Sequence, residues 1–343
     1  MSFDITIESS GHRFPVERGE TLLEAALAHG IGLPYGCRNG SCGSCMATLL
    51  SGRVHYPDGP PPALEGQAED QVIVCQALAD SDVLLRVREV ELEQDIVVKT
   101  LPCRAEHMER LSEDVMLVQL RLPEAERLQF LAGQYIEFIL KDGRRRAFSI
   151  ANAPHRDDFL ELHIRHVPGG SFTGHVFEEM QDRALLRIEG PLGSFYLRER
   201  SARPILMMAG GTGFAPLKGM LEHAFHIGLE NPLHLFWGAR SEPDLYLDEL
   251  PRRWQQEHAN FRYTPVLSEP GPDWQGASGP VDEALLAEYP DLAGFDIYMS
   301  GPPAMIESAT PRFADHGAQL EHMYSDAFEF ASDVLEKMGH TGA

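Results

Sequence analysis

The sequence contains no apolar run that approaches the roughly 20 residues of a membrane-spanning helix. Its first residues, MSFDITIESS, show no basic region followed by an apolar segment, so we expect no signal peptide. Both absences predict a cytoplasmic protein with no membrane partner.

Positive charge is scarce in this chain. Its 343 residues include 29 lysines and arginines against 52 aspartates and glutamates, which gives a formal net charge of −23 at pH 7. Nucleic acids and anionic membranes repel such a protein because they carry charge of the same sign, so we expect no nucleic acid partner. A group of acidic residues in the N-terminal part forms either a solvated face or a docking surface for a basic partner: Asp58, Glu65, Glu69, Asp70, Asp80 and Asp82.

Cysteine is also infrequent. The chain has five cysteines, and an odd number does not suit a closed set of disulfides. No HExxH or GxSxG motif occurs, so the zinc-protease and serine-hydrolase patterns are both missing. What the chain does have is 43% hydrophobic residues, enough for the buried cores of two or three globular domains.

Three blocks of different texture follow one another along the chain. The first begins with a predicted hairpin over 3–8 and 13–17, followed by a helix in which Thr21 and Glu24 occupy capping-box positions. The expected divisions are an N-terminal block 1–92, a linker 93–100, a second block 101–202, a third block 203–332 and a tail 333–343.

The second and third blocks differ in how their strands follow one another. Block 101–202 has short strand-like runs separated by turn signals, typical of an antiparallel barrel or sandwich, and a short helix is expected over HVFEEM at 175–180. Block 203–332 alternates strands with helices, which predicts a parallel sheet covered on both faces.

The cysteines carry the most specific signal. The segment YGCRNGSCGSC has the spacing C-x₄-C-x₂-C, a plant-type [2Fe-2S] pattern, and Gly36, Gly40 and Gly43 allow its backbone to curl around a cluster. A tetrahedral zinc site is the alternative, although zinc ribbons prefer paired C-x₂-C knuckles and only one such pair is present. Cys103 is expected to be an ordinary buried thiol. The predicted cluster ligands are Cys37, Cys42, Cys45 and Cys75.

Several further motifs accompany the cysteines. RAFS at 146–149 is followed by the glycine loop GGSFT at 169–173. GGTGFAP at 210–216 ends a buried strand and opens a helix, as phosphate-binding loops do. SGPPAM at 300–305 ends a later strand, and YSDAF at 324–328 lies near the C-terminus.

With these motifs, residues 1–92 resemble a plant-type ferredoxin, and the rest resembles the ferredoxin–NADP⁺ reductase superfamily. The whole chain resembles the bacterial NADH-dependent iron–sulfur flavoprotein reductases, in appearance above all the CDP-6-deoxy-glucoseen reductase type and the reductase components of oxygenases. The resemblance implies a multidomain α+β and α/β fold: a β-grasp ferredoxin domain, an antiparallel β-barrel flavin domain and a parallel-sheet α/β nicotinamide domain.

The resemblance also implies roles for the motif residues. Arg146 holds the flavin pyrophosphate, Phe148 stacks on the flavin and Ser149 bonds its ring nitrogen, and FAD is favoured over FMN, which the residues alone leave open. The residues expected to bind the flavin are Arg146, Ala147, Phe148, Ser149, His163, Ile164, Arg165, Gly169, Gly170, Ser171 and Thr173, those on the strand at 163–165 mainly through their backbone.

The remaining motifs are expected to bind the dinucleotide. Glu242 and Asp244 would repel a 2′-phosphate, whereas Arg240 could pair with one, and on balance NADH is predicted over NADPH. Ser300 replaces the cysteine usual in the family near the reacting nicotinamide. The expected dinucleotide residues are Gly210, Gly211, Thr212, Gly213, Ala215, Pro216, Gly238, Arg240, Gly301, Pro302 and Met305.

Three residues are expected at the reacting rings: Ser149, Ser300 and Phe328. Phe328 would cover the flavin, and Phe330 is the alternative residue for this role. The purely structural alternative is an aromatic ring that is buried in a seam between two domains. The predicted activity is electron transfer from NADH through FAD and the cluster, one electron at a time, to an acceptor protein. That acceptor is either a CDP-6-deoxy-hexose dehydratase or an oxygenase component. Two alternatives belong to other functional classes. One is a redox sensor without rapid turnover, and the other is a binding domain stabilised by zinc.

Overall fold

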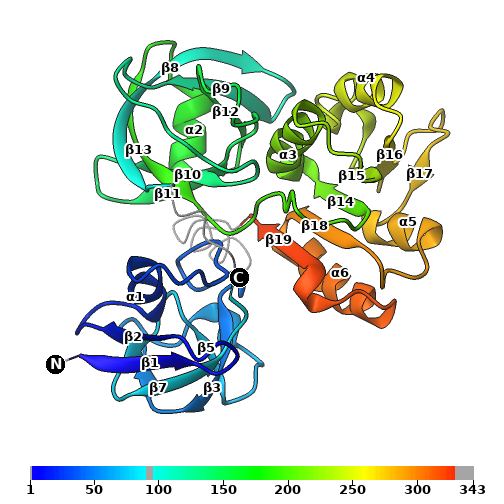
Figure 1. Cartoon of the computed structure of the whole chain (residues 1–343). Helices are drawn as coiled ribbons and strands as arrows, with labels where there is room; N and C mark the ends of the chain where they lie inside the picture. Colours follow the sequence, from blue (N-terminus) through cyan, green and yellow to red (C-terminus); the bar gives the residue numbers. More distant parts are fainter. Residues whose placement is uncertain (1, 90–95, 329–343) are drawn as a thin grey trace, which may run out of the picture. The chain divides into compact units, whose positions relative to one another are not determined.

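The computed structural model describes residues 2–89 and 96–328 (Figure 1). The chain divides into two compact units, of which the first runs to Ile96 and includes Gly193–Phe195, and the second comprises the rest. Residues 93–95 of the expected linker, residue 332 and the expected tail 333–343 lie outside the described residues.

The first unit is built on a five-stranded mixed sheet with the strand order β2-β1-β7-β3-β5. The predicted hairpin is confirmed, because β1 and β2 pair antiparallel, while β1 and β7 pair parallel. The elements are β1 (Phe3–Ile7), β2 (Arg13–Val16), β3 (Met46–Ser51), β5 (Gln71–Ile73) and β7 (Val83–Arg86), with a small second sheet of β4 (Val54–His55) and β6 (Leu78–Ala79), and a short 3₁₀ helix η1 (Pro62–Leu64).

Helix α1 (Leu22–Ala28) packs against this sheet and completes the β-grasp fold. The predicted capping box is confirmed: the Glu24 amide donates to Thr21 Oγ1 at 3.2 Å, and the Thr21 amide donates to Glu24 Oε2 at 3.0 Å. A cap of this kind stabilises a helix by about 1 kcal/mol. The helix therefore begins at a defined residue and buries its apolar face, which includes Leu22 and Leu23.

The second unit begins with a six-stranded antiparallel sheet in the order β11-β10-β13-β8-β9-β12. An antiparallel bridge between Ile150 and Leu162 joins its two ends, so the sheet closes into the predicted barrel. The strands are β8 (Lys99–Arg110), β9 (Val115–Arg121), β10 (Tyr135–Ile139), β11 (Arg145–Ser149), β12 (Leu160–Arg165) and β13 (Leu185–Leu192).

Helix α2 (Ser171–Glu178) belongs to the barrel, since Phe172 and Val176 are buried in its core (Figure 1). The helix was expected over 175–180, and this range was wrong. The backbone leaves the left-handed conformation at Gly169, where φ is +78°, and Gly170 serves as the N-cap, so the helix starts four residues earlier. The glycine loop therefore leads directly into the first turn of α2.

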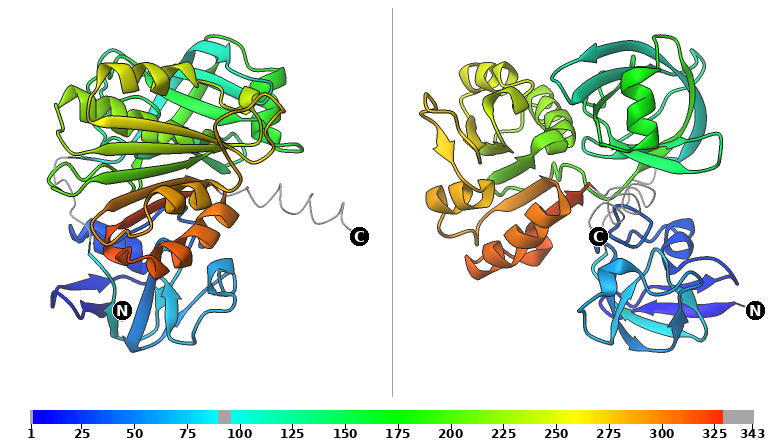
Figure 2. Two further views of the ribbon diagram at one scale, coloured as in Figure 1. Left: turned by 90° about the vertical axis from the view of Figure 1, so that its right-hand side faces the viewer. Right: turned by 180° about the vertical axis from the view of Figure 1, so that it is seen from behind.

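The rest of the second unit is a six-stranded sheet, parallel throughout, in the order β17-β16-β15-β14-β18-β19. Helices α3 (Phe214–His226) and α4 (Glu249–Glu257) lie on one face, and α5 (Val281–Glu288) and α6 (Pro303–Asp315) on the other (Figure 2). The strands are β14 (Ile205–Gly210), β15 (Leu233–Ala239), β16 (Phe261–Leu267), β17 (Ala277–Ser278), β18 (Asp296–Gly301) and β19 (Met323–Ala327); short 3₁₀ turns are η2 (Gly211–Gly213), η3 (Glu242–Asp244) and η4 (Leu320–His322).

The strand order reverses between β14 and β18, which lie side by side although far apart in the sequence. Both strands are buried along their whole length. In open parallel sheets, ligands bind at the carboxyl ends of the strands where the order reverses. The motifs that follow these two strands, at 210–216 and 300–305, therefore meet at the expected dinucleotide position.

Candidate functional sites

The cysteine loop brings the four predicted ligands into two pairs. The amide of Cys37 donates to Cys42 Sγ at 3.4 Å, and the amide of Cys42 donates to Cys37 Sγ at 3.4 Å. A hydrogen bond from the Cys37 side chain, supported by the Cys37 amide, lowers the pKa of Cys42 to about 5, although burial opposes this shift. Cys42 is therefore poised to be a thiolate, the form that binds iron.

The second pair is buried and consists of Cys45 and Cys75. Contact with the Cys45 thiol, and then burial, raises the pKa of Cys75, and the charges of Cys37 and Cys42 act on it in the same direction. All four sulfurs thus share one electrostatic site. Among the described residues, no group of three or more His, Cys, Asp or Glu side chains surrounds a single metal-ion position. Two pairs of thiols, rather than four around one point, fit a two-iron cluster better than one tetrahedral zinc ion.

Two glycines of this loop lie where a side chain would come too close to neighbouring atoms. Gly40 has φ of +87°, and a Cβ there would lie 2.8 Å from Pro61 Cβ. A Cβ on Gly36 would lie 3.2 Å from Cys42 Sγ. Glycine is required at residue 40 and leaves a tight fit beside the sulfur at residue 36, as expected for a backbone that wraps a cluster. Cys103, by contrast, is buried in the barrel core, and this prediction is confirmed.

Strand β11 carries the flavin motif. Of its three consecutive arginines, Arg144 is paired with Asp142 and Arg145 with Glu137 and Glu189, whereas Arg146 donates to the main-chain carbonyl of Arg145 at 2.7 Å. Ala147, the residue after Arg146, is exposed, and Phe148 is half-buried. The Phe148 ring lies 5.7 Å from Phe138 and from Phe172 of the barrel core.

The second flavin motif forms a tight cradle at the start of α2. Thr173 Oγ1 accepts from the Val167 amide at 3.1 Å, and a Cβ on Gly170 would lie 2.6 Å from that hydroxyl oxygen. Gly169 is in the left-handed region, and the Gly170 amide donates to the Val167 carbonyl at 2.9 Å, so the helix begins at Ser171 with Gly170 as its N-cap. Such a cradle at a helix N-terminus fits the flavin pyrophosphate.

Strand β12 places the three remaining flavin candidates in different environments. His163 is buried and bonded to Glu161 and Tyr246, and Ile164 lies in the barrel core. Arg165 donates through Nε to Asp114 at 2.8 Å, and a Cβ on Gly211 would lie 2.7 Å from its Nη1. These side chains do not form one cluster, and the Arg165 guanidinium lies at the dinucleotide glycines.

The dinucleotide loops of β14 and β18 pack against each other without room for side chains. A Cβ on Gly213 would lie 1.9 Å from the Ser300 carbonyl oxygen, and one on Gly210 would lie 2.7 Å from Met305 Sδ and 2.9 Å from Pro302 Cδ. A Cβ on Gly301 would lie 2.9 Å from Met305 Cε. The sequence motifs at 210–213 and 300–305 are therefore brought together.

Other residues of the motif support this loop. Thr212, Ala215 and Pro216 are buried at the start of α3, and Gly238, at the end of β15, allows Val281 to approach. Trp237 Nε1 donates to the Gly211 carbonyl at 2.9 Å.

Ser300 is fully buried, and its hydroxyl has no hydrogen-bond partner in the part of the chain that the structure describes. A buried hydroxyl without a partner is uncommon, since it loses hydration without compensation. It lies at the carboxyl end of β18, beside the glycine loop.

Arg240 and Asp244 form an ion pair near the same edge. Arg240 Nη2 lies 3.2 Å from Asp244 Oδ1 and 3.9 Å from Asp114 Oδ2, while Asp244 Oδ2 also accepts from the amide and hydroxyl of Ser241. A 2′-phosphate would have to compete with both carboxylates for the Arg240 guanidinium.

The C-terminal motif supplies a residue that sequence reasoning missed. The Phe328 amide donates to the Gly301 carbonyl at 2.9 Å, and its side chain is half-buried, whereas Phe330 lies outside the described residues. On β19, Asp326 pairs in register with Ser300 and accepts a hydrogen bond from Ser149 Oγ at 3.0 Å. The sequence motif YSDAF predicts a site role for its aromatic residue only, although the same motif also contains Asp326.

Within residues 2–89 and 96–328, no helix combines the length and apolar character that crossing a membrane requires.

Comparison with known domain families covers all three parts of the chain. A 2Fe-2S iron-sulfur cluster binding domain matches residues 5–80, an oxidoreductase FAD-binding domain matches 102–196, and an oxidoreductase NAD-binding domain matches 207–310. The three domains occur in the predicted order and bear out the predicted cofactors.

Relatives are similar over their whole length. The CDP-6-deoxy-L-threo-D-glycero-4-hexulose-3-dehydrase reductase of Yersinia pestis is 39% identical over 96% of this chain and 99% of its own. Reductase component 2 of the terephthalate 1,2-dioxygenase of Comamonas sp. is 36% identical over 96% of this chain and 98% of its own. Among solved structures, the Amycolatopsis cytochrome P450 reductase GcoB is 32% identical, covers 96% of this chain and 100% of its own, and superposes with a TM-score of 0.78.

Proposed function

The chain belongs to the family of oxidoreductases that join a 2Fe-2S domain to FAD-binding and NAD-binding domains, and we propose that it supplies electrons from NADH to a CDP-6-deoxy-hexose dehydratase. The observation that carries the proposal is the full-length similarity, at 39% identity, to a reductase of that system.

The bound flavin and cluster supply the conversion of a two-electron hydride into single electrons. The chain's own residues would bind these groups, orient them and shield them from solvent. The two pairs of thiols would hold iron, the cradle at Gly170 would receive a pyrophosphate, and the loops at Gly213 and Ser300 would lie at the nicotinamide end of the dinucleotide. Asp326 holds the hydroxyl proton of Ser149 in a fixed direction.

NADH rather than NADPH is the proposed electron donor. The support is the engagement of Arg240 by Asp244 and Asp114, since a 2′-phosphate would bring further negative charge to a place that already holds two carboxylates. A cytoplasmic location also remains a proposal, and it is supported by four thiols that must stay reduced to bind iron.

An oxygenase component is the second candidate acceptor. Its support is the full-length similarity to the reductase component of a terephthalate dioxygenase and to a cytochrome P450 reductase of known structure. The redox-sensor and zinc-stapled readings have no comparable support, because the relatives named here are reductases and the thiols lie in two pairs.

The experiment that tests the proposal is affinity capture of the tagged holoprotein from its native lysate, followed by reconstitution of the captured enzyme with NADH. Capture of a pyridoxamine-phosphate dehydratase that turns over with NADH and this protein supports the proposal. Capture of an oxygenase component that turns over instead overturns it in favour of the second candidate. The variant Cys75→Ser serves as the control that binds flavin without a complete cluster, and it should give no turnover with either acceptor.

A further inference from the structure

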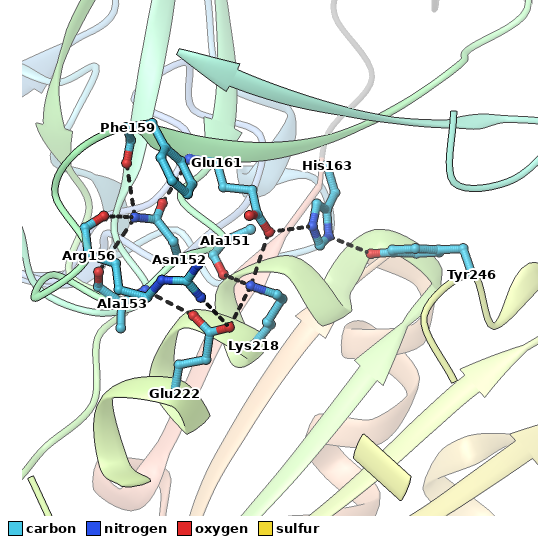
Figure 3. A network of polar contacts seen from close by, with 10 residues as sticks. All are labelled: Ala151, Asn152, Ala153, Arg156, Phe159, Glu161, His163, Lys218, Glu222 and Tyr246. Carbon is cyan, nitrogen blue, oxygen red and sulfur yellow. Dashed lines mark hydrogen bonds and ion pairs between the residues drawn. The ribbon is translucent and has the colours of Figure 1, made fainter. Parts of the chain in front are cut away.

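Lys218 lies on α3, where its ammonium group is buried among atoms of the flavin barrel (Figure 3). Nζ lies 3.0 Å from Glu161 Oε1 on β12 and 2.8 Å from Glu222 Oε1 on its own helix. It also donates to the Ala151 carbonyl at 3.1 Å. One charged group therefore joins the parallel-sheet part of the second unit to two separate segments of the barrel.

These contacts lie close in sequence to both ligand motifs. Lys218 is on the helix that starts directly after the glycine loop, and Ala151 follows Ser149 by two residues. An α-helix rises about 1.5 Å per residue, so Lys218 is only about 7 Å along the axis from Gly213. The first turns of α3 therefore connect the contacts of Lys218 with the dinucleotide loop.

The junction is also close-packed. A Cβ on Gly219 would lie 3.0 Å from the Asn152 carbonyl oxygen and 3.2 Å from the Ile150 carbonyl oxygen. Asn152 in turn accepts from the Glu161 amide at 2.7 Å and donates to the Phe159 carbonyl at 3.1 Å. The segment that Lys218 contacts is thus held by several hydrogen bonds, and a side chain at residue 219 would crowd the main chain of this segment.

A second path leads from Glu161 back to the dinucleotide loop. Glu161 bonds His163 Nε2 at 3.1 Å, and His163 Nδ1 lies 3.0 Å from the hydroxyl of Tyr246. The Tyr246 ring packs edge-on against Trp237, whose indole N–H donates to the Gly211 carbonyl. Burial would raise the pKa of Glu161, but His163 and Lys218 lower it to about 2, so this carboxylate is charged.

We propose that Lys218 is a positioning residue for hydride transfer: it ties the dinucleotide loop to the segment after the flavin serine and so sets how the nicotinamide approaches the flavin. Two buried carboxylates face the Lys218 ammonium, while Arg156 Nη1 lies 3.6 Å from Glu222 and His163 bonds Glu161. Removing the ammonium takes the shorter ion pair from each carboxylate, and loss of a partner from a buried pair is destabilising. Loss of the ammonium should therefore let α3 move away from the barrel. Small errors in the distance between reacting atoms reduce hydride transfer far more than they reduce binding.

The test compares variants of the holoprotein by stopped-flow reduction of the flavin with NADH. Lys218→Met should lower the limiting rate by about tenfold or more, while the dissociation constant of NADH changes by less than about threefold. Asp282→Asn is the matched control, because it breaks a buried pair with Arg312, between α5 and α6, that does not reach the barrel. It should lower the melting temperature while leaving the limiting rate within about twofold of the wild type.

Hydrogen exchange of the apoprotein supplies a readout that needs no cofactor. In Lys218→Met, exchange should rise together in residues 150–165 and 214–222, whereas Asp282→Asn should leave 150–165 unchanged. If Lys218→Met does not fold, Glu161→Gln, which keeps the side-chain volume, decides the matter, and its limiting rate should fall by about threefold or more.

Limiting rates within about twofold of the wild type in Lys218→Met, or in Glu161→Gln where the first does not fold, would overturn the proposal. The inference rests on flavin reduction by NADH and not on the identity of the acceptor. A wild-type protein whose flavin NADH does not reduce would contradict the proposed function itself, so the two failures are distinguishable.

Discussion

Ser149 and Asp326 meet across a separation of 177 residues: the serine hydroxyl donates to the aspartate carboxyl at 3.0 Å. Ser149 ends the strand that carries the flavin motif, and Asp326 lies on the last described strand, beside Ser300. The contact therefore links the barrel to the parallel sheet of the second unit, where flavin and nicotinamide are expected to meet.

Asp326→Asn tests this pair. A hydrogen bond to a charged group contributes more than one between neutral groups, and we expect the rate of flavin reduction by NADH to fall about tenfold, or about 1.4 kcal/mol in the barrier. Stopped-flow absorbance measures this rate, and the flavin content should be unchanged. Asp273→Asn, which removes the same charge from an exposed loop, should leave the rate unaltered.

The pair acts as a unit in this account. The double variant Ser149→Ala/Asp326→Asn should therefore be no slower than Ser149→Ala alone. Rate losses that simply multiply in the double variant would show that the two residues act independently.

The cysteines provide a second prediction. Serine at any one of the four cluster positions should abolish delivery of electrons to the partner while NADH–ferricyanide activity through the flavin remains. Cys103→Ala is the matched control, because Cys103 lies buried in the barrel core, and it should retain the visible absorption of the cluster. Loss of both activities in a cluster variant with full flavin content would contradict the serial order. The four positions are Cys37, Cys42, Cys45 and Cys75.

The sequence predicted those parts of the molecule that depend on local patterns. The cysteine spacing, the capping box at Thr21 and the alternation of strands and helices after residue 203 each fix structure within a short segment.

What sequence reasoning missed depends on contacts between distant segments. No spacing rule connects Ser149 with Asp326, or Lys218 with Glu161, because each pair forms only when barrel and parallel sheet pack together. The start of α2 differs for a local reason: the sequence assigns 169–173 to a glycine loop, whereas Gly170 is the N-cap and Ser171 already begins the helix.

Coenzyme preference gives a third prediction. In Asp244→Asn the charge that engages Arg240 is lost while an oxygen that can accept from Ser241 remains, so kcat/KM for NADPH should rise about tenfold relative to NADH. Steady-state kinetics with both coenzymes measure the ratio. Glu249→Gln removes an exposed charge from the first turn of α4 and should not change it. A wild-type enzyme that already uses NADPH as well as NADH would contradict the basis of this prediction.

Acidification should destabilise the parallel-sheet part through His234. This side chain is buried between Tyr289 and Thr264, and burial, reinforced by Arg262, lowers its pKa to about 3. The unfolded chain binds the proton near pH 6.5 and the folded chain only near pH 3, so stability present above pH 6.5 is lost as the pH falls toward 3. Between pH 7 and pH 5 the loss should be about 2 kcal/mol.

The fluorescence of Trp237, Trp254 and Trp274, the three tryptophans of the chain, reports urea unfolding of this part. His234→Gln removes the titrating group. Between pH 7 and pH 5 its free energy of unfolding should therefore fall by about 2 kcal/mol less than that of the wild type. Parallel pH profiles for the two proteins would mean that His234 does not remain neutral in the fold.

The central claim is that NADH reduces the cluster by way of the flavin within one chain. Anaerobic mixing of the holoprotein with NADH, followed by freezing and electron paramagnetic resonance, tests it most directly. The account predicts that the signal of a reduced [2Fe-2S] cluster appears in the wild type and in Cys103→Ala. It should be missing when the flavin has been removed from an otherwise intact protein. A cluster that stays oxidised in the wild type while the flavin is fully reduced, or one that NADH reduces without flavin, would contradict it.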